Sequence, residues 1–284
     1  MCMSLQSILL MGTPLFSVKL FEYIYIQFPD LEYTVMTKVD QSVGRGLKIS
    51  FCPVKQWALS CDFSVIQPND KKELLASVQS INPDLIIICA YGVILPKDIT
   101  DSYHCINIHT SLLPKFRGAS PIQAALLNHD KETGVTLMKV NEKMDSGDII
   151  SQLKTDILTD DTYGTLLDRL GNLSRLLVFD YIHCLLNNET IKSIKQNDSD
   201  ATYCQKIEKD MCLLTDTLSA QDVFGRVRAL SPKPGAYVLV NGQRVKILSG
   251  KIENGYFIPV SIQPEGKSIM SYNDYRLGKP EILF

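Results

Sequence analysis

The run DLIIICA at Asp84–Ala90 constrains the fold more than any other part of this sequence. A continuous apolar run of this length is typical of a parallel strand that helices cover on both faces. A second apolar run, Ser7–Met11, ends at Gly12, and Pro14 then suits the first turn of a helix. Strands that alternate with helices in this way predict a Rossmann-like α/β domain with a doubly wound, mostly parallel sheet. In such sheets, ligands bind beyond the carboxyl ends of the strands.

Periodicity and turn residues predict the remaining elements. We expect strands at residues 33–38, 134–140 and 148–153, and helices at residues 71–81, 120–128 and 162–186. After a polar stretch, we expect a helix at 219–229 and short strands at 235–240, 243–249 and 256–263. Asn241-Gly242 predicts a tight hairpin between the first two of these strands. The chain is therefore expected to have a large α/β domain at 1–186, a linker at 187–205 and a small β domain at 206–284.

Two polar residues interrupt the apolar strand CINIH at 105–109. Asn107 and His109 are two residues apart, so on a strand they point to the same face. Asp145 follows later, in the acidic, glycine-containing turn MDSGD at 144–148. An amide and an imidazole can stabilise an oxyanion, and a carboxylate can hold the tautomer and charge of the imidazole. We therefore interpret Asn107, His109 and Asp145 as a catalytic group for acyl transfer that needs no covalent intermediate.

Short motifs run in order from the first strand almost to the C-terminus. They are MGTP at 11–14, GRG at 44–46, AYGVILP at 90–96, NIHTSLLPKFRG at 107–118, PIQ at 121–123, MDSGD at 144–148 and QPEGK at 263–267. Together they resemble the 10-formyltetrahydrofolate transferase family, and in particular its members that act on charged tRNA. The resemblance implies that 10-formyltetrahydrofolate donates a formyl group as co-substrate and that the site needs no metal. The implied acceptor is the amino group of methionine on the initiator methionyl-tRNA, for translation initiation.

The resemblance also implies which segments bind the two substrates. Folate is expected against Ser111, Leu112, Leu113 and Pro114, with Ala90, Tyr91, Gly92, Val93, Ile94 and Leu95 as the opposite wall. Phosphates of the tRNA are expected near Arg45, Lys48, Lys115 and Arg117. Before the basic loop, Asp40–Val43 depart from the family's usual Pro-Asp-x-Pro-x-Gly, so the path of residues 40–52 stays open.

The small β domain is expected, by the same resemblance, to be OB-like and to extend the tRNA-binding surface. Residues 206–284 carry 11 Lys and Arg against 8 Asp and Glu, whereas the whole chain has a net charge of −2. This excess fits contact with a polyanion, and chance variation of the surface explains an excess of this size as well.

Three alternatives stay open at this point. Glycinamide ribonucleotide formyltransferase shares the folate site and the catalytic group, but it lacks a C-terminal β domain. A second alternative is a formyltransferase or hydrolase acting on an amino sugar or on formyl-folate itself. A third is a non-catalytic tRNA-binding protein, which the intact catalytic group disfavours.

Cysteine usage and hydropathy indicate the compartment. The eight cysteines are scattered, with neither a CxxC motif nor the spacing of a zinc site, which predicts a reducing cytoplasm. Cys89 and Cys105 lie in apolar runs and are expected to be buried thiols. The N-terminal apolar run has no preceding Lys or Arg and is expected to be a core strand. No run approaches the roughly 18 apolar residues of a membrane span. The second and third glycines of GxGxxG are absent after Gly12, which argues against a nicotinamide cofactor. We expect a monomer.

Overall fold

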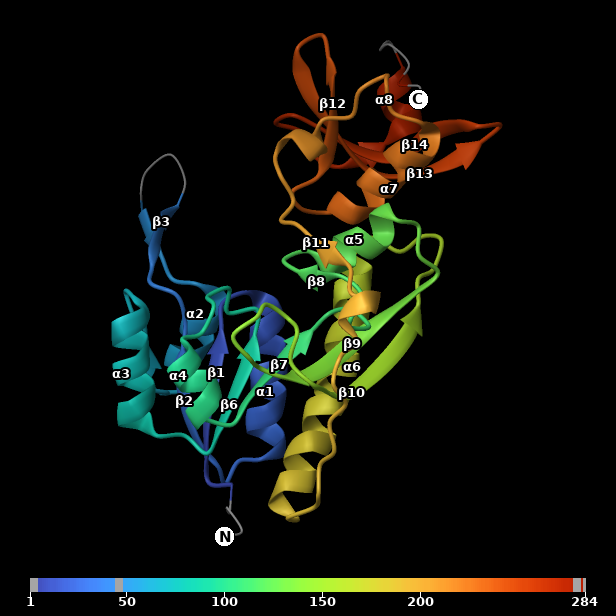
Figure 1. Ribbon diagram of the computed structural model, residues 1–284. Helices are drawn as coiled ribbons and strands as arrows, with labels where there is room; N and C mark the ends of the chain where they lie inside the picture. Colours follow the sequence, from blue (N-terminus) through green and yellow to red (C-terminus); the bar gives the residue numbers. More distant parts are fainter. Residues whose placement is uncertain (1–4, 44–47, 278–281, 283–284) are drawn as a thin grey trace. The chain divides into compact units, whose positions relative to one another are not determined.

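A computed structural model describes residues 5–43, 48–277 and 282 of the 284-residue chain (Figure 1). The chain forms two compact units, and each is described by itself. Unit 1 comprises Met1–Arg117, Gly134–Lys154 and Leu170–Thr202. Unit 2 comprises Gly118–Thr133, Thr155–Arg169 and Tyr203–Phe284.

A seven-stranded sheet with the order β10-β9-β7-β6-β1-β2-β5 organises unit 1. The strands are β1 (Ser7–Gly12), β2 (Glu32–Met36), β5 (Val65–Ile66), β6 (Leu85–Cys89), β7 (Cys105–His109), β9 (Glu132–Lys139) and β10 (Ile149–Asp156). The pairings from β5 to β7 are all parallel, and β9 runs antiparallel to β7. This confirms the predicted mostly parallel α/β sheet.

Helices cover both faces of this sheet, which explains why β6 can be apolar throughout. They are α1 (Leu15–Gln27), α2 (Pro53–Ser60), α3 (Lys71–Ile81), α4 (Lys97–Ser102) and the long α6 (Tyr163–Leu186). Leu9 and Ile86 pack with Leu74 of α3 and Ile99 of α4 in one buried cluster. Figure 1 shows α1 on the opposite side of β1 from α3. The predicted buried thiols are confirmed in Cys89 and Cys105, and burial raises the pKa of both to about 12.

The strand order reverses direction between β1 and β6. From β1 the chain adds β2 on one side, and from β6 it adds β7 on the other side. A reversal of this kind opens a crevice beyond the carboxyl ends of the strands, where α/β proteins bind ligands. The loops after β1 and β6 meet there, because Thr13 Oγ1 donates to the carbonyl oxygen of Tyr91 at 3.3 Å.

Unit 2 contains a small antiparallel sheet with the order β12-β13-β14-β15. Its elements are α5 (Pro121–Leu127), α7 (Ala220–Leu230), β12 (Ala236–Val240), β13 (Gln243–Glu253), β14 (Tyr256–Pro264), β15 (Met270–Ser271) and α8 (Tyr272–Arg276). Asn241 and Gly242 have φ values of 51° and 78°, as the predicted tight hairpin requires. The register between β13 and β14 shifts beside Ser249, as at a β-bulge. Over the described residues, β12 and β15 are the edges of this sheet.

Several short elements gave no clear signal in the sequence. They are α2, α4, the hairpin of β3 (Gln41–Val43) and β4 (Lys48–Ser50), the pair β8 (Arg117–Gly118) and β11 (Tyr203–Cys204), and the 3-10 turns η1 (Asp198–Asp200) and η2 (Asp210–Cys212). The predicted linker also has structure, because Ile194 and Ile149 exchange two backbone hydrogen bonds of 2.8 Å. Within the described ranges, no helix is both long enough and apolar enough to cross a membrane.

Gly12 is expected to be essential for the close approach of β1 to α1. A Cβ at this position would lie 2.7 Å from Phe21 Cε2 and 2.9 Å from the carbonyl oxygen of Cys89. We expect Gly12→Ala to destabilise unit 1 by about 1–3 kcal/mol, as overpacking does in close-packed cores.

Gly171→Ala is the matched control. Its Cβ would meet Phe16 at 3.4 Å, an ordinary contact, and alanine suits a helix interior better than glycine by roughly 0.5–1 kcal/mol. Urea unfolding followed by the fluorescence of Trp57, the one tryptophan in the sequence, reports on unit 1. Equal stability of the two variants would contradict the close approach.

Candidate active site

Strand β7 carries the two polar residues that the sequence analysis singled out. Asn107 pairs with Met138 and His109 with Thr136 across the antiparallel ladder to β9. Both residues therefore project from the same face of the sheet, at the carboxyl end of β7. Asn107 is half-buried, and its side-chain amide makes no hydrogen bond within the described residues.

The imidazole of His109 is buried between two acceptors. The ring is 6% exposed, its Nε2 lies 2.9 Å from the carbonyl oxygen of Phe116, and its Nδ1 lies 3.6 Å from Oδ2 of Asp145. Nε2 is the donor in the first contact, because a carbonyl oxygen only accepts. A proton on Nδ1 would then lie between the ring and the carboxylate. The structure thus brings His109 and Asp145 together from segments 36 residues apart in sequence.

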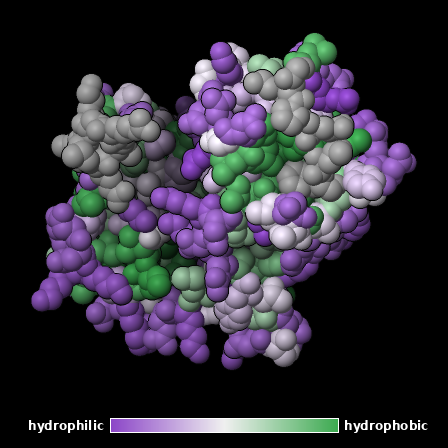
Figure 2. All heavy atoms as spheres, turned by 90° about the horizontal axis from the view of Figure 1, so that it is seen from above, coloured by the Kyte–Doolittle hydropathy of each residue, from purple (hydrophilic) through white to green (hydrophobic). Residues whose placement is uncertain are grey.

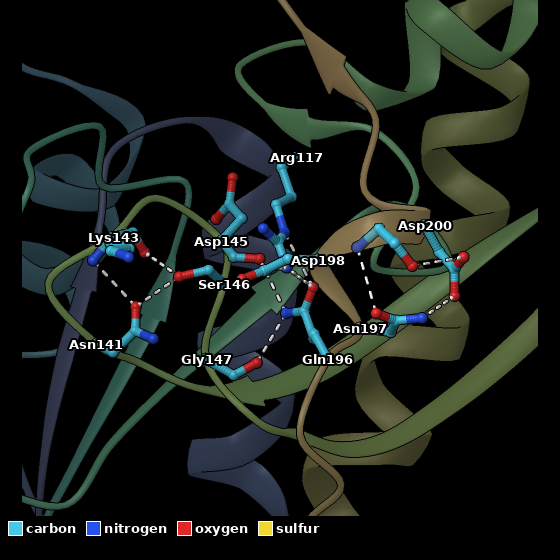
Figure 3. Close-up of polar contacts among 11 residues, drawn as sticks. Arg117, Asn141, Lys143, Asp145, Ser146, Gly147, Gln196, Asn197, Asp198 and Asp200 are labelled. Carbon is cyan, nitrogen blue, oxygen red and sulfur yellow. Dashed lines mark hydrogen bonds and ion pairs between the residues drawn. The ribbon is translucent and has the colours of Figure 1, made fainter.

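Asp145 lies in a turn held by short-range hydrogen bonds (Figure 3). The Asn141 side chain accepts from the Lys143 amide and from the Ser146 hydroxyl, each at 3.0 Å. Gly147 is required by space, because a Cβ there would lie 1.9 Å from the carbonyl oxygen of Lys139. Asp145 itself has a φ of 50°, in the left-handed region that few non-glycine residues adopt. Its side chain is 15% exposed.

Asp148, at the end of the same acidic turn, forms hydrogen bonds with Ser193 and Lys139. Its carboxylate accepts from the Ser193 hydroxyl at 3.3 Å, and its backbone carbonyl accepts from the Lys139 amide at 2.9 Å. These contacts close the turn and begin β10.

The loop after β6 presents apolar side chains to solvent. Val93 and Ile94 are 38% and 52% exposed, whereas Tyr91 and Leu95 are buried in the core of unit 1. Burial raises the pKa of the Tyr91 hydroxyl to about 12. Hydrophilic side chains cover most of the face drawn in Figure 2, and apolar surface shows there only in separate areas. Two adjacent exposed apolar residues at a ligand-binding edge are suited to a flat apolar partner.

The loop after β7 is braced from the neighbouring strands. The Thr136 hydroxyl donates to the carbonyl oxygen of Ser111 at 2.6 Å and accepts from the amide of Leu113 at 3.1 Å. Gln152 Nε2 donates to the carbonyl oxygen of Leu113 at 2.9 Å. Ser111 and Leu113 are buried, while Leu112 and Pro114 are half-buried. Thr136 and Gln152 therefore support this loop, although no sequence motif indicated either residue.

Of the predicted phosphate-binding residues, the structure describes the side chains of Lys115 and Arg117, and these two differ in burial. Arg45 lies outside the described residues, and Lys48 lies at the start of β4. Lys115 is exposed, with its Nζ 4.8 Å from the centroid of the Phe116 ring. Arg117 is 2% exposed, and its guanidinium bonds to Gln196 and Asp198. Arg117 is thus engaged inside unit 1, a position that does not suit a direct phosphate contact.

A polar network holds the base of the β3–β4 hairpin. Lys55 Nζ donates at 2.5 Å to the Asp40 carboxylate and to Gln67 Oε1, and Gln67 Nε2 donates to the same carboxylate at 3.0 Å. These hydrogen bonds, with that from Lys55 the largest cause, hold the pKa of Asp40 below its usual range. The network therefore fixes the position of Asp40, the residue that precedes the hairpin.

Metal chemistry has no candidate residues in the described part of the chain. No three His, Cys, Asp or Glu side chains gather there as metal ligands do. The chemistry available at the end of β7 is that of an amide, an imidazole and a carboxylate.

Comparison with known families identifies the class of protein. The Formyl transferase family matches residues 29–180, and the family described as Formyl transferase, C-terminal domain matches residues 206–257. The first match alone spans more than half of the chain. This protein belongs to the formyl transferase family.

Two similar relatives are both named methionyl-tRNA formyltransferase. The methionyl-tRNA formyltransferase of Fusobacterium nucleatum is 38% identical over 253 residues, which cover 88% of this chain and 81% of the relative. The methionyl-tRNA formyltransferase of Streptococcus pyogenes is 35% identical over 297 residues, covering 95% of each protein.

Solved structures of formyltransferases share the fold. The methionyl-tRNA formyltransferase from Clostridium thermocellum aligns with a TM-score of 0.63 at 20% identity, over 92% of this chain and 99% of that one. A 4-N formyltransferase from Francisella tularensis aligns with a TM-score of 0.70 at 19% identity, over 89% and 100%. An N-formyltransferase from Helicobacter canadensis, solved in complex with folinic acid and dTDP-3-aminofucose, aligns at 0.66 and 20% identity, over 94% and 98%.

Proposed function

We propose that this protein transfers a formyl group from 10-formyltetrahydrofolate to the amino group of methionine on the initiator methionyl-tRNA. The observation that carries the proposal is the His109 ring, buried at the carboxyl end of β7 with its Nδ1 3.6 Å from the Asp145 carboxylate. The proposed substrates are inferred from the relatives named methionyl-tRNA formyltransferase, which are 35–38% identical over most of the chain.

The proposed reaction proceeds without a covalent enzyme intermediate. The amine nitrogen of methionine attacks the formyl carbon, and a tetrahedral intermediate with an oxyanion forms. The C–N bond to the folate N10 then breaks, the amine nitrogen loses a proton, and N10 gains one. The amide of Asn107, which has no partner within the described residues, and the imidazole of His109 donate to the oxyanion. His109 and Asp145 hold the proton that passes between the two nitrogens.

Folate is proposed to lie between the loops that follow β6 and β7. Val93 and Ile94 offer exposed apolar surface for a pteridine face, and the loop Ser111–Pro114 offers backbone groups for its polar edge. Tyr91, Leu95 and Leu113 are buried, so they shape the wall from behind. The hydrogen bonds of Thr136 to Ser111 and Leu113 hold the backbone of the loop on which folate is proposed to lie.

The β domain is proposed to bind tRNA. We divide the chain functionally into a catalytic domain at 1–186, a linker at 187–205 and a tRNA-binding domain at 206–284. The family matches, which end at 180 and begin again at 206, support this division. A C-terminal domain of this family favours a tRNA acceptor over glycinamide ribonucleotide. We also propose a cytoplasmic monomer, which cell fractionation and size-exclusion chromatography test.

Substitution of the oxyanion donors tests the proposed chemistry. Asn107→Ala and His109→Ala are each expected to lower kcat for formylation of methionyl-tRNA by about 100- to 1000-fold, the usual loss for one oxyanion donor. The binding of a folate analogue should change little, because both groups act mainly on the transition state. If either variant keeps more than about a tenth of the wild-type rate, well short of that loss, the oxyanion assignment is wrong.

Lys48 of β4 and Lys115, which follows β7, are expected to contact tRNA phosphates. Lys48→Ala combined with Lys115→Ala should weaken the use of methionyl-tRNA while sparing folate affinity. Each lost phosphate contact reduces the slope of log affinity against log salt by about 1, so the loss should be largest at low ionic strength. Titration of KM for tRNA between low and high salt measures this. A salt-independent loss, or an equal loss of folate affinity, would place these lysines in the folate pocket instead.

A further inference from the structure

One buried side chain from the predicted linker bonds to both the Asp145 turn and Arg117. Gln196 is 6% exposed. Its Nε2 donates to the backbone carbonyl oxygens of Asp145 at 2.9 Å and Gly147 at 2.7 Å. Its Oε1 accepts from Nε of Arg117 at 3.0 Å and from Nη2 at 2.9 Å. The amide thus uses both of its donor hydrogens and both lone pairs of its oxygen.

These partners fix the orientation of the Gln196 amide. If the amide were turned over, its NH2 would face the N–H donors of Arg117, and its oxygen would face two carbonyl oxygens. Both contacts would then be repulsive, so only one orientation satisfies the network. Figure 3 shows Gln196 between Arg117 and the Asp145 turn.

The backbone on either side of Gln196 is anchored to the same unit. Ile194 exchanges two hydrogen bonds with Ile149, immediately after the acidic turn. At the other end, Thr202 accepts from the amide of Arg117 through its carbonyl oxygen and from the amide of Phe116 through its hydroxyl, each at 2.8 Å. The 194–202 segment therefore holds the loops that supply both acceptors of the His109 ring.

The Asp145 turn needs a contact of this kind. Its short-range hydrogen bonds join Asn141, Lys143 and Ser146. Gln196 bonds to the carbonyls of Asp145 and Gly147, one on each side of Ser146. Since Asp145 has a left-handed backbone, a hydrogen bond at its carbonyl restrains the conformation that points its carboxylate at His109.

We propose that Gln196, oriented by Arg117, is a positioning residue that holds the Asp145 carboxylate against Nδ1 of His109. The inference rests on the proposed function, because it acts through Asp145. It assigns Arg117 to the support of the catalytic turn rather than to a tRNA phosphate.

Gln196→Glu is the test substitution because it keeps the shape of the side chain and its contact with Arg117. The new carboxylate cannot donate, so it would repel the carbonyls of Asp145 and Gly147. We expect kcat to fall about 10- to 100-fold, the cost of a catalytic group displaced by up to an ångström. KM for 10-formyltetrahydrofolate should stay within about twofold, because the proposed folate loops are untouched. A kcat within about threefold of wild type would overturn the proposal.

Asp198→Asn is the matched control. Asp198 accepts from the same Arg117 Nη2 at 2.8 Å, but its side chain is 78% exposed, whereas Gln196 is buried and bonds directly to the turn. The Arg117 hydrogen bond holds the pKa of Asp198 below its usual range, and the neutral amide should still leave kcat near wild type. A loss equal to that of Gln196→Glu would mean that the network acts through Arg117 alone, which overturns the role of Gln196. If Gln196→Glu does not fold, as judged by Trp57 fluorescence, Gln196→Ala takes its place with the same criteria.

A double-mutant cycle with Asp145→Asn separates this inference from the proposed function. If Gln196 acts through Asp145, adding Gln196→Glu to Asp145→Asn should lower kcat by less than about threefold, because groups that act as a unit are not additive. A full additional loss would show that Gln196 acts elsewhere, and the inference alone fails. If Asp145→Asn by itself keeps the wild-type kcat, the catalytic role of Asp145 fails, and the positioning role of Gln196 fails with it.

Discussion

The parallel pairing of β1, β6 and β7 is the constraint on which the candidate site depends. Its register sets Gly12 beside Cys89, and Ile88 beside Asn107. The three strands therefore end at one edge of the sheet, and their loops meet there. This register is stable because helices cover both faces of the sheet, which gives every residue of β6 a buried position. The strand order thus determines where the candidate site lies, and the side chains determine its chemistry.

An imidazole buried at this edge needs hydrogen-bond partners from the loops around it. A buried polar group is costly unless it is hydrogen-bonded, and a low-dielectric setting strengthens the bonds that it makes. His109 meets this demand with the carbonyl of Phe116 and the carboxylate of Asp145. Both partners lie in loops outside β7, so the placement of the ring depends on how those loops are held. The contacts of Gln196 and Thr202 suggest that a single segment serves both.

Local signals in the sequence were enough to predict the frame of the molecule. The helix at Lys71–Ile81 and the hairpin at Asn241-Gly242 are present as expected, because helical spacing and turn chemistry act over a few residues. Asn107 and His109 could be recognised as neighbours because strand periodicity puts them on one face. The proximity of Asp145 to His109 was inferred from the complementary chemistry of the two side chains and from the family resemblance, because no spacing in the sequence indicates it.

The supporting residues could not be predicted, for a physical reason. Gln196 lies in a polar stretch without periodicity, and its partners are 49 and 79 residues away in sequence. Arg117 was expected near a tRNA phosphate because of the family resemblance and its place beside the catalytic strand. Its burial depends on those distant partners. Hydrogen-bond networks between loops are a property of the folded chain, and no local pattern of residues encodes them.

Acceptor choice is the most direct measure of the central claim, that the site formylates methionine on the initiator tRNA. Purified protein and 10-formyltetrahydrofolate would be offered charged initiator tRNA and glycinamide ribonucleotide in parallel, and kcat/KM measured for each. We predict efficient formylation of the methionyl-tRNA and none of the ribonucleotide. Turnover of glycinamide ribonucleotide with the tRNA left unformylated would contradict the account.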